Sequence, residues 1–320
     1  MTTPQPSILV TGGAGFVGSH LVELLSTTKP KVKIHVTTYS NQPSYIHQLL
    51  PAEQIHQLDL THQANTFALI KKLKPTQIYH LAALSAVGKS FSNVKKVLDN
   101  NIELQLNLLE AVKKHQPQAK ILVIGSAMEY DLVTDYDNFS PTAITEDYPL
   151  GPVSPYAVSK AMQDFLGHSY AQSCQLNIVR VRPFNHIGER QSPEFVVPAF
   201  AQQIVAIEKG QQKQIEVGNL EAIRDFTDVK DMVRAYQLLM EKGEVDQVYN
   251  VGSGQGRSIK QILELLIDQA KTEIKVEIDQ AKIRPIDVPV AVAKPDKINQ
   301  LGWKPKLKLS NTLTRILDYW

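Results

Sequence analysis

Apolar and β-branched residues recur along the first half of the chain in short runs separated by longer stretches with helical spacing. The runs include Ser7–Gly12 and the segments KIHVTT, QIYHLAA and KILVIGS, and each ends in small or polar residues. Helical patterns such as Thr61–Leu73 and Phe91–Gln116 lie between them. Strands that alternate with helices in this way predict an α/β fold with a parallel sheet covered on both faces.

The pattern changes in the second half of the chain. Leu176–Pro183 predicts a further strand, after which Pro193 and Pro198 interrupt the alternation and the polar loops lengthen. Val248–Ser253 again has the pattern of a buried strand, and a helix from Ser258 to about Gln269 follows it. A sheet strand this late predicts that a second, smaller lobe is interleaved with the first. We expect the first domain to span 1–182, with 225–260 returning to it, and the second to comprise mainly 183–320.

Composition narrows the class of protein. The chain has 320 residues, and its 34 basic and 32 acidic side chains nearly cancel. This balance gives no support to a nucleic-acid or membrane partner. The single cysteine, Cys174, fits a reducing compartment. The first ten residues lack the pattern of a signal peptide, and no apolar stretch approaches the roughly 20 residues that span a bilayer. We therefore expect a cytoplasmic protein.

A glycine-rich segment, TGGAGFVGSH, follows the first predicted strand and opens the first predicted helix. Gly12, Gly15 and Gly18 stand three residues apart, so that a diphosphate can approach the backbone N–H groups and the positive end of the helix. The alternative is a turn that needs glycine only for tight packing. Its place in the first strand–turn–helix unit favours a Rossmann dinucleotide-binding loop.

The choice between the two nicotinamide cofactors depends on the end of the second strand. An acidic residue there would bind the ribose 2′-hydroxyl of NAD. The segment Val36–Gln42 has neither a carboxylate nor an arginine, whereas its hydroxyls, including Ser40, and the Asn41 amide tolerate a phosphate. We therefore favour NADP(H), with NAD(H) possible. Asp59 is placed to meet the adenine, although it could instead belong to a polar loop beside a helix N-terminus.

A second group of residues indicates catalysis. Tyr156 and Lys160 lie four residues apart in SPYAVSK, which places them on one face of a helix. An adjacent ammonium group favours the phenolate, so we expect Lys160, together with the cationic oxidised nicotinamide, to lower the pKa of Tyr156. Ser126 ends the KILVIGS strand, where its hydroxyl can hold a substrate oxygen against Tyr156, unless it is a capping serine.

With these motifs the chain resembles the extended short-chain dehydrogenase/reductases over essentially its whole length. The resemblance rests on TGGAGFVG, Asp59-Leu60, HLAA, Asn101, GSAMEY, YAVSK, RPFN and RDFTD. It implies a doubly wound Rossmann sheet with a smaller C-terminal substrate-binding lobe. It also implies contacts with the cofactor from a set of residues in the first half of the chain: Gly12, Gly15, Phe16, Val17, Gly18, Ser40, Asp59, Leu60, Leu81, Ala82, Ala83, Tyr156 and Lys160.

The second half is most similar to GDP-4-dehydro-6-deoxy-D-mannose reductases and to the related GDP-mannose 4,6-dehydratases. The similar stretches are FNHIGERQSPEFVVPAFAQQI, VGNLEAIRDFTDVKDMVRAY and IRPIDVP. The resemblance implies a GDP-sugar substrate that contacts Ser85, Ser126, Asn185, Val197, Arg224 and Arg284. The two arginines would clamp the pyrophosphate, since a guanidinium matches phosphate oxygens. The alternative is that each forms a salt bridge within the lobe, with Asp225 or Asp228 for Arg224 and with Asp287 for Arg284.

The residue at one position distinguishes a reductase from a dehydratase. The dehydratases of this family carry a glutamate two residues after the catalytic threonine or serine, and this chain has Met128 there. A thioether cannot remove the C5 proton of the sugar. Glu129 is one residue away and in an extended segment would point the opposite way. We therefore expect reduction of the C4 ketone of GDP-4-dehydro-6-deoxy-D-mannose by NAD(P)H, giving a GDP-6-deoxyhexose of the GDP-D-rhamnose type.

Three alternatives remain: a GDP-mannose 4,6-dehydratase, an epimerase or dehydratase for another nucleotide sugar, and a binding protein of this fold without catalysis. The chain also departs from the reductases at Gly188-Glu189-Arg190-Gln191, where they have Gly-Pro-Gly-Gln, and at Asp131. By resemblance we expect a homodimer. The apolar stripe Ile102, Leu106, Leu109 and Val112 fits either dimerisation or burial against the sheet. The histidines show no metal-ligand spacing, so no metal is assigned.

Overall fold

The largest sheet of the chain has seven strands. In the computed structural model, which describes residues 6–40, 44–133, 143–282 and 288–320, the strand order is β11-β6-β5-β4-β1-β2-β3. All neighbours from β3 to β6 are parallel, which confirms the predicted α/β fold. The chain starts in the middle of the sheet and reverses direction beside β1, the order of a doubly wound Rossmann sheet. The strands are β1 (Ser7–Thr11), β2 (Lys33–Thr38), β3 (Ile55–Gln57), β4 (Gln77–His80), β5 (Lys120–Ile124), β6 (Asn177–Pro183) and β11 (Val248–Val251).

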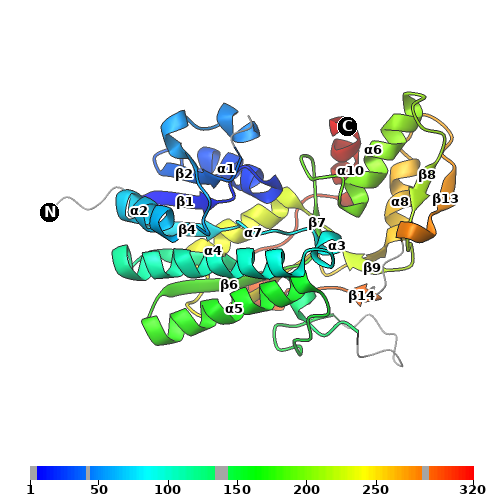
Figure 1. Ribbon diagram of the computed structural model, residues 1–320. Coiled ribbons are helices and arrows are strands. Elements are labelled where there is room, and N and C mark those ends of the chain that lie inside the picture. The colour runs from blue at the N-terminus through cyan, green and yellow to red at the C-terminus, as the bar shows by residue number, and fades with distance from the viewer. Residues whose placement is uncertain (1–5, 41–43, 134–142, 283–287) are drawn as a thin grey trace. The chain divides into compact units, whose positions relative to one another are not determined.

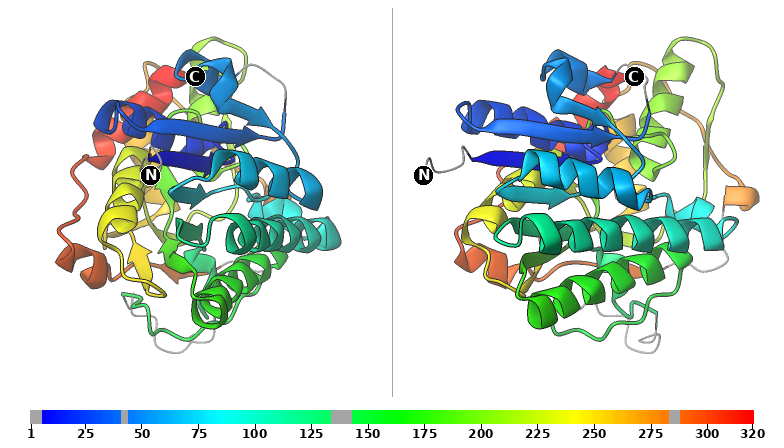
Figure 2. Two further views of the ribbon diagram at one scale, coloured as in Figure 1. Left: turned by 90° about the vertical axis from the view of Figure 1, so that its left-hand side faces the viewer. Right: turned by 60° about the vertical axis from the view of Figure 1, so that its left-hand side comes forward.

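Helices follow the strands as expected for parallel connections. They are α1 (Phe16–Thr28), α2 (Gln63–Leu73), α3 (Val87–Ser90), α4 (Val94–His115), α5 (Pro155–Cys174) and α7 (Val229–Lys242). Helices α4 and α5 lie side by side (Figures 1 and 2). Apolar residues of α2, α4 and α5 form one core with the strands, which includes Ile70, Leu108, Ile121 and Ile178.

The helix expected over Phe91–Gln116 is found as α4 (Val94–His115), which begins three residues later than expected and is preceded by the separate short helix α3. Asn93 has non-helical backbone angles, with φ −135° and ψ 43°, and its side-chain amide donates to the Lys89 carbonyl. Helix α3 therefore ends at Ser90, and α4 begins at Val94. The reason is the ability of an asparagine side chain to bond the nearby backbone in place of the helical hydrogen bond.

The chain forms two compact units that alternate along the sequence. The first comprises Met1–Glu129, Ser154–Arg182 and Val233–Tyr249, and the second comprises Tyr130–Val153, Pro183–Met232 and Asn250–Trp320. The division therefore differs from the expected one in two respects. The segment 130–153 belongs to the second unit, and the returning segment is shorter than 225–260.

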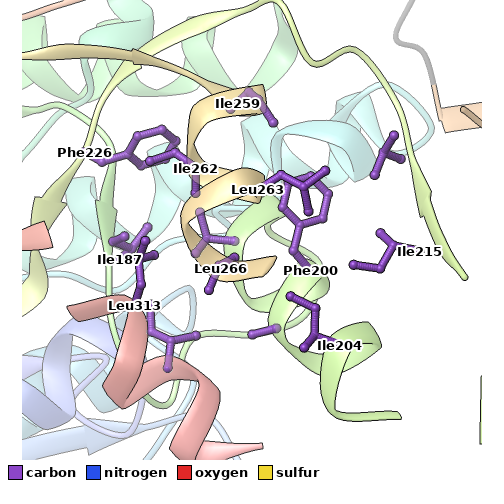
Figure 3. Close-up of a cluster of buried hydrophobic side chains, with 14 of the residues drawn as sticks. Ile187, Phe200, Ile204, Ile215, Phe226, Ile259, Ile262, Leu263, Leu266 and Leu313 are labelled. Carbon is purple, nitrogen blue, oxygen red and sulfur yellow. The ribbon is translucent and has the colours of Figure 1, made fainter. Parts of the chain in front are cut away.

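The second unit is built around an apolar core between helices and short strands. Its helices are α6 (Val196–Glu208), α8 (Ile259–Ile267), α9 (Asp296–Gln300) and α10 (Leu309–Tyr319). Phe200, Ile262 and Leu313 bring α6, α8 and α10 into this core (Figure 3). The strands are β7 (His186–Ile187), β8 (Ile215–Val217), β9 (Ile223–Asp225), β10 (Thr227–Asp228), β12 (Gly256–Ser258), β13 (Val276–Ile278) and β14 (Val290–Ala291). They pair as β10-β7, β12-β9-β14 and β13-β8.

Candidate active site

The glycine-rich turn joins β1 to α1 in the first unit. Gly12 has φ +67°, a left-handed conformation that favours glycine, and a Cβ there would lie 3.0 Å from the Cα of Ala82. Gly18 packs against the carbonyl of Gly12 so closely that no side chain fits between them. Gly15 is the N-cap residue of α1 and is exposed. These features fit the diphosphate of a dinucleotide.

The turn after β4 is tied to the glycine-rich turn by polar side chains. The Thr11 hydroxyl lies 2.9 Å from Nδ1 of His80 and accepts the N–H of Ala82 at 3.1 Å. The Asn101 side chain accepts the N–H of Leu84 at 2.8 Å. These bonds hold the Leu81–Ala83 run beside Gly12, where the resemblance places cofactor contacts.

The residues expected near the adenosine are only partly defined. Ser40 is exposed at the end of β2, next to Tyr39, whose side chain is 80% exposed. Asn41 lies outside the described residues. Asp59 is exposed, and its carboxylate accepts the N–H and the hydroxyl of Thr61 at 2.9 and 2.7 Å. Asp59 therefore stabilises the polar turn before α2, and its contact with adenine stays a prediction.

Helix α5 positions the tyrosine and the lysine. Its first turn is fixed by Ser154, whose hydroxyl accepts the N–H of Ala157, and by Pro155 at the first helical position. One helical turn then separates Tyr156 from Lys160. The ammonium group of Lys160 donates to the carbonyl oxygen of Ile124 at 2.6 Å and to Oε1 of Gln163 at 2.9 Å. Lys160 is thus anchored to the end of β5, next to Ser126.

The pKa of Tyr156 depends on its burial and on its neighbours. Burial raises its pKa to about 12, and the negative charge of Glu129 acts in the same direction, while a hydrogen bond with Ser126 lowers it. The pKa of Lys160 is lowered to about 8 by burial. The ammonium group of Lys160 is directed at Ile124 and Gln163, and the expected lowering of the phenol pKa by Lys160 together with the oxidised nicotinamide stays a prediction. A pKa of about 12 keeps the Tyr156 phenol protonated at neutral pH.

The segment after Ser126 is a short 3-10 helix, Ala127–Glu129, and the extended conformation assumed from the sequence is wrong. The Ser126 hydroxyl accepts the N–H of Met128 at 3.2 Å, which turns the chain. The Glu129 side chain is fully buried as a result. Its Oε1 accepts the N–H of Ser126 at 2.6 Å, and its Oε2 accepts Nε–H of Arg182 at 3.0 Å.

The expected substrate residues have different environments. Ser85 is exposed in the loop before α3, and the Asn185 side chain is exposed in the second unit. The Val197 side chain is fully buried in the apolar core of that unit, so it packs there and does not line a polar surface. Arg284 lies outside the described residues, as does Asp287.

Arg224 is 8% exposed on β9, and its guanidinium donates to the carbonyl oxygen of Ile223 at 2.9 Å. Asp225 accepts N–H groups of Ser253 and Gly254, and Asp228 is bound by Arg315. The structure also reveals a residue that sequence reasoning missed. Arg257 on β12 stands directly opposite Arg224 in an antiparallel pair, which places both side chains on one face of this small sheet. No periodic pattern in the sequence marks such short strands.

Within the described ranges, no group of three or more histidine, cysteine or acidic residues could hold a metal ion. None of the helices in the same ranges is long and apolar enough to cross a membrane.

The Rossmann sheet, the glycine-rich turn and the Ser126–Tyr156–Lys160 set define a nicotinamide-dependent oxidoreductase of the extended short-chain type. Residues 9–316 match the model of a family described as GDP-mannose 4,6 dehydratase. The chain belongs to this family.

Curated relatives and solved structures agree with this assignment. The chain is 32% identical over 315 residues to a GDP-6-deoxy-D-mannose reductase of Pseudomonas aeruginosa, covering 98% of this chain and 96% of that protein. It is 28% identical to a GDP-6-deoxy-D-talose 4-dehydrogenase of Aggregatibacter actinomycetemcomitans, covering 92% and 91%. The structure of RMD from Pseudomonas aeruginosa complexed with NADPH superposes with a TM-score of 0.85 at 31% identity, and covers 98% of each chain.

Proposed function

We propose that this enzyme reduces the C4 ketone of GDP-4-dehydro-6-deoxy-D-mannose with NAD(P)H and forms a GDP-6-deoxyhexose of the GDP-D-rhamnose type. The observation that carries the proposal is the pair Met128 and Glu129. Met128 occupies the position of the dehydratase glutamate, and both oxygens of the neighbouring Glu129 are held by N–H donors inside the first unit. No carboxylate at these two positions is free to remove a proton from sugar carbon C5.

The geometry of the first unit supports a simple division of roles. A bound reduced nicotinamide supplies the hydride. The raised pKa of Tyr156 keeps its phenol protonated, so that it can donate a proton to the C4 oxygen as negative charge develops there. The Ser126 hydroxyl hydrogen-bonds the same oxygen. Lys160, held through Ile124 and Gln163, presents its remaining N–H to the cofactor ribose.

The second unit supplies the residues that we propose to bind the GDP part of the substrate. Arg224 and Arg257 face the same side of the β12-β9-β14 sheet, and two guanidinium groups suit a pyrophosphate. Asn185 is exposed and able to bond the sugar, and so is Ser85 of the first unit. Val197 would bind the substrate through its backbone groups. Arg284 is assigned to the pyrophosphate by resemblance.

The preferred cofactor is proposed to be NADP(H), with NAD(H) also used. The end of β2 through Ser40 has no acidic residue that would repel a 2′-phosphate. Initial rates with each reduced cofactor at equal concentrations test this preference. A higher kcat/KM for NADH would contradict it.

Purified enzyme distinguishes the reductase from the dehydratase. We expect oxidation of NADPH only when the 4-keto sugar nucleotide is supplied, and no conversion of GDP-mannose alone. Turnover of GDP-mannose without a net change in nicotinamide absorbance would overturn the proposal. Proton NMR of the product identifies the configuration at C4, which separates a rhamnose-type product from its talose-type epimer.

Tyr156→Phe tests the assigned proton donor. We expect kcat to fall by about 10²- to 10⁴-fold, because the general acid is removed while the ring remains. The affinity for NADPH, measured by fluorescence titration, should change much less than kcat, because Tyr156 is one of many cofactor contacts. Unchanged turnover would contradict the mechanism.

We also propose that the enzyme is a cytoplasmic homodimer that associates through α4 and α5. Leu109 and Val112 of the expected apolar stripe are buried in the core, but Leu106 is 38% exposed. Met162 and Phe165 on α5 are 42% and 56% exposed. Light scattering should give twice the chain mass for the wild type, and Phe165→Glu should give a monomer.

A further inference from the structure

The aromatic side chain of Tyr39 is exposed to solvent at the end of β2. Its exposed fraction, 80%, is the largest among the large hydrophobic side chains of the described ranges. The preceding Thr37 and Thr38 are buried, so the chain leaves the interior of the sheet between Thr38 and Tyr39. A single exposed ring is common on protein surfaces, so its significance depends on what surrounds it.

The strand that ends before Tyr39 also holds the glycine-rich turn. The backbone N–H of Gly12 donates to the Thr37 hydroxyl at 3.2 Å, and the N–H of Gly13 donates to the Thr37 carbonyl oxygen at 3.0 Å. Gly13 lies so close to Val36 that a Cβ on the glycine would overlap the valine side chain. The turn that fits the diphosphate is therefore packed against β2 directly before Tyr39.

The other neighbour of β2 is β3, which is followed by the turn at Asp59. The N–H of Leu58 donates to the Thr38 carbonyl oxygen at 3.0 Å, so the two segments stay paired up to Tyr39. Strands β1 and β2 lie side by side (Figure 1), and β2 is placed between β1 and β3. Tyr39 therefore stands between the glycine-rich turn and the Asp59 turn. This carboxyl edge of the sheet is where doubly wound folds bind their ligands.

Tyr39 occupies the place at which a Rossmann fold contacts the adenosine half of its cofactor. In the dinucleotide pattern this residue comes roughly 20 residues after the glycines and is an acid for NAD, or has an arginine nearby for NADP. Tyr39 stands at that spacing from Gly18, and the segment from Val36 through Ser40 has neither an acid nor a cation. A neutral ring does not distinguish the charge of a 2′-phosphate. Its face, however, suits the face of a purine, and such stacking is a substantial source of affinity.

We propose that Tyr39 is a cofactor-binding residue whose ring stacks on the adenine of both NADPH and NADH. The inference rests on the proposed reductase function and deepens its cofactor assignment. Because the two cofactors carry the same adenine, this contact contributes equally to the binding of both, and the enzyme is able to use either. Discrimination between them then depends on groups that reach the ribose 2′ position, such as the Ser40 hydroxyl.

Two substitutions separate the ring of Tyr39 from its hydroxyl. In Tyr39→Ala the dissociation constants of NADPH and NADH should rise by the same factor, roughly 10- to 100-fold, because the stacking face is lost. Tyr39→Phe keeps this face, so its dissociation constants should stay close to those of the wild type. The exposed ring makes little packing contact in the free enzyme, so both variants should fold. Tyr319→Ala, which removes a 51% exposed tyrosine from α10, is the matched control.

Isothermal titration calorimetry without any sugar nucleotide measures these dissociation constants. ADP-ribose, which has the adenine but no nicotinamide, serves as a third ligand and should lose affinity for Tyr39→Ala by the same factor. Equal losses for the three ligands, with wild-type affinity in Tyr39→Phe and Tyr319→Ala, support the proposal. Unchanged constants in Tyr39→Ala overturn it. A loss confined to NADPH, or an equal loss in Tyr39→Phe, also overturns it, because the hydroxyl and not the ring would then be the contact.

The titrations contain no sugar substrate, so they separate this inference from the proposed reaction. A wild type that binds NADPH and does not reduce the 4-keto sugar refutes the reaction alone. Equal dissociation constants in the wild type and Tyr39→Ala refute the role of Tyr39 alone. At saturating NADPH the kcat of Tyr39→Ala should stay near that of the wild type, because the adenine takes no part in hydride transfer.

Discussion

Buried polar side chains surround the ammonium group of Lys160. Gln163 accepts from Lys160 through Oε1, and its Nε2–H donates to the carbonyl of Asn101 at 2.7 Å. Gln105 donates to the backbone carbonyl of Gln163 at 2.7 Å. The amide of Gln163 is thus fixed between α4 and α5. Because burial lowers the pKa of Lys160 to about 8, acceptors for its ammonium form decide how much of it stays charged.

Replacing Gln163 by leucine should weaken the hold on Lys160. The ammonium group loses one of two protein acceptors in a buried setting, which costs about 1–3 kcal/mol. We expect kcat/KM for NADPH to fall by roughly 5- to 100-fold at neutral pH, with partial recovery at lower pH as Lys160 regains its proton. Steady-state kinetics across pH measures this, and Ser173→Ala, on the exposed side of α5, is the control. A pH-independent loss would show that Gln163 only supports packing.

Short strands of the second unit place two positive charges face to face. Strand β9 lies between β12 and β14, and the register sets Arg224 opposite Arg257. Like charges directly opposite each other on neighbouring strands destabilise a sheet by several tenths of a kcal/mol. An anion bound between them would remove this cost, which is the physical reason to assign a pyrophosphate to this face.

Arg257→Gln should therefore weaken binding of the sugar nucleotide while leaving the chemistry intact. Loss of one charge-assisted contact is worth about 1.5–3 kcal/mol, so KM should rise by roughly 10- to 100-fold with kcat nearly unchanged. Calorimetric binding of GDP measures the same contact without catalysis. Lys260→Gln, an exposed cation nearby in sequence, should have no effect. Equal GDP affinity in wild type and Arg257→Gln would remove Arg257 from the site.

Buried histidines make the stability of the whole molecule depend on pH. Nδ1 of His35 on β2 lies 2.9 Å from Nε2 of His56 on β3, and burial together with its partner lowers the pKa of His35 to about 4. Burial also lowers the pKa of His80 to about 3. Because these folded-state values lie below the ordinary value near 6.5, the unfolded chain binds more protons than the folded one.

The free energy of unfolding should thus decrease as pH falls below about 6.5 and continue to decrease to about pH 4. For His35 the loss amounts to up to about 3 kcal/mol. Urea denaturation at a series of pH values measures it. His35→Gln should make this decrease of the free energy of unfolding at low pH smaller. His62→Gln, which changes an exposed histidine before α2, should leave the decrease unchanged. If the free energy of unfolding decreases equally at low pH in the wild type and both variants, groups other than His35 cause the acid sensitivity.

The parts of the molecule that follow from local patterns could be predicted, and those that depend on distant partners could not. Apolar runs marked the strands of the main sheet, and glycine spacing marked the turn at Gly12, because both are local requirements of backbone and burial. Glu129 was misjudged because its direction depends on a hydrogen bond from the Met128 N–H to the Ser126 hydroxyl and on Arg182, 53 residues away. Arg257 was missed because its partner strand lies far off in the sequence.

The alternation of the two units has a consequence for synthesis on the ribosome. The first unit needs Val233–Tyr249, but Tyr130–Val153 and Pro183–Met232 of the second unit emerge before it. The nascent chain must therefore keep an incomplete sheet edge at β6 until β11 appears, and an exposed edge invites pairing with other chains. For the same reason, no single crossover between two genes of this family can exchange the second unit whole. A recombinant that gains a new second unit must inherit it as three separate pieces.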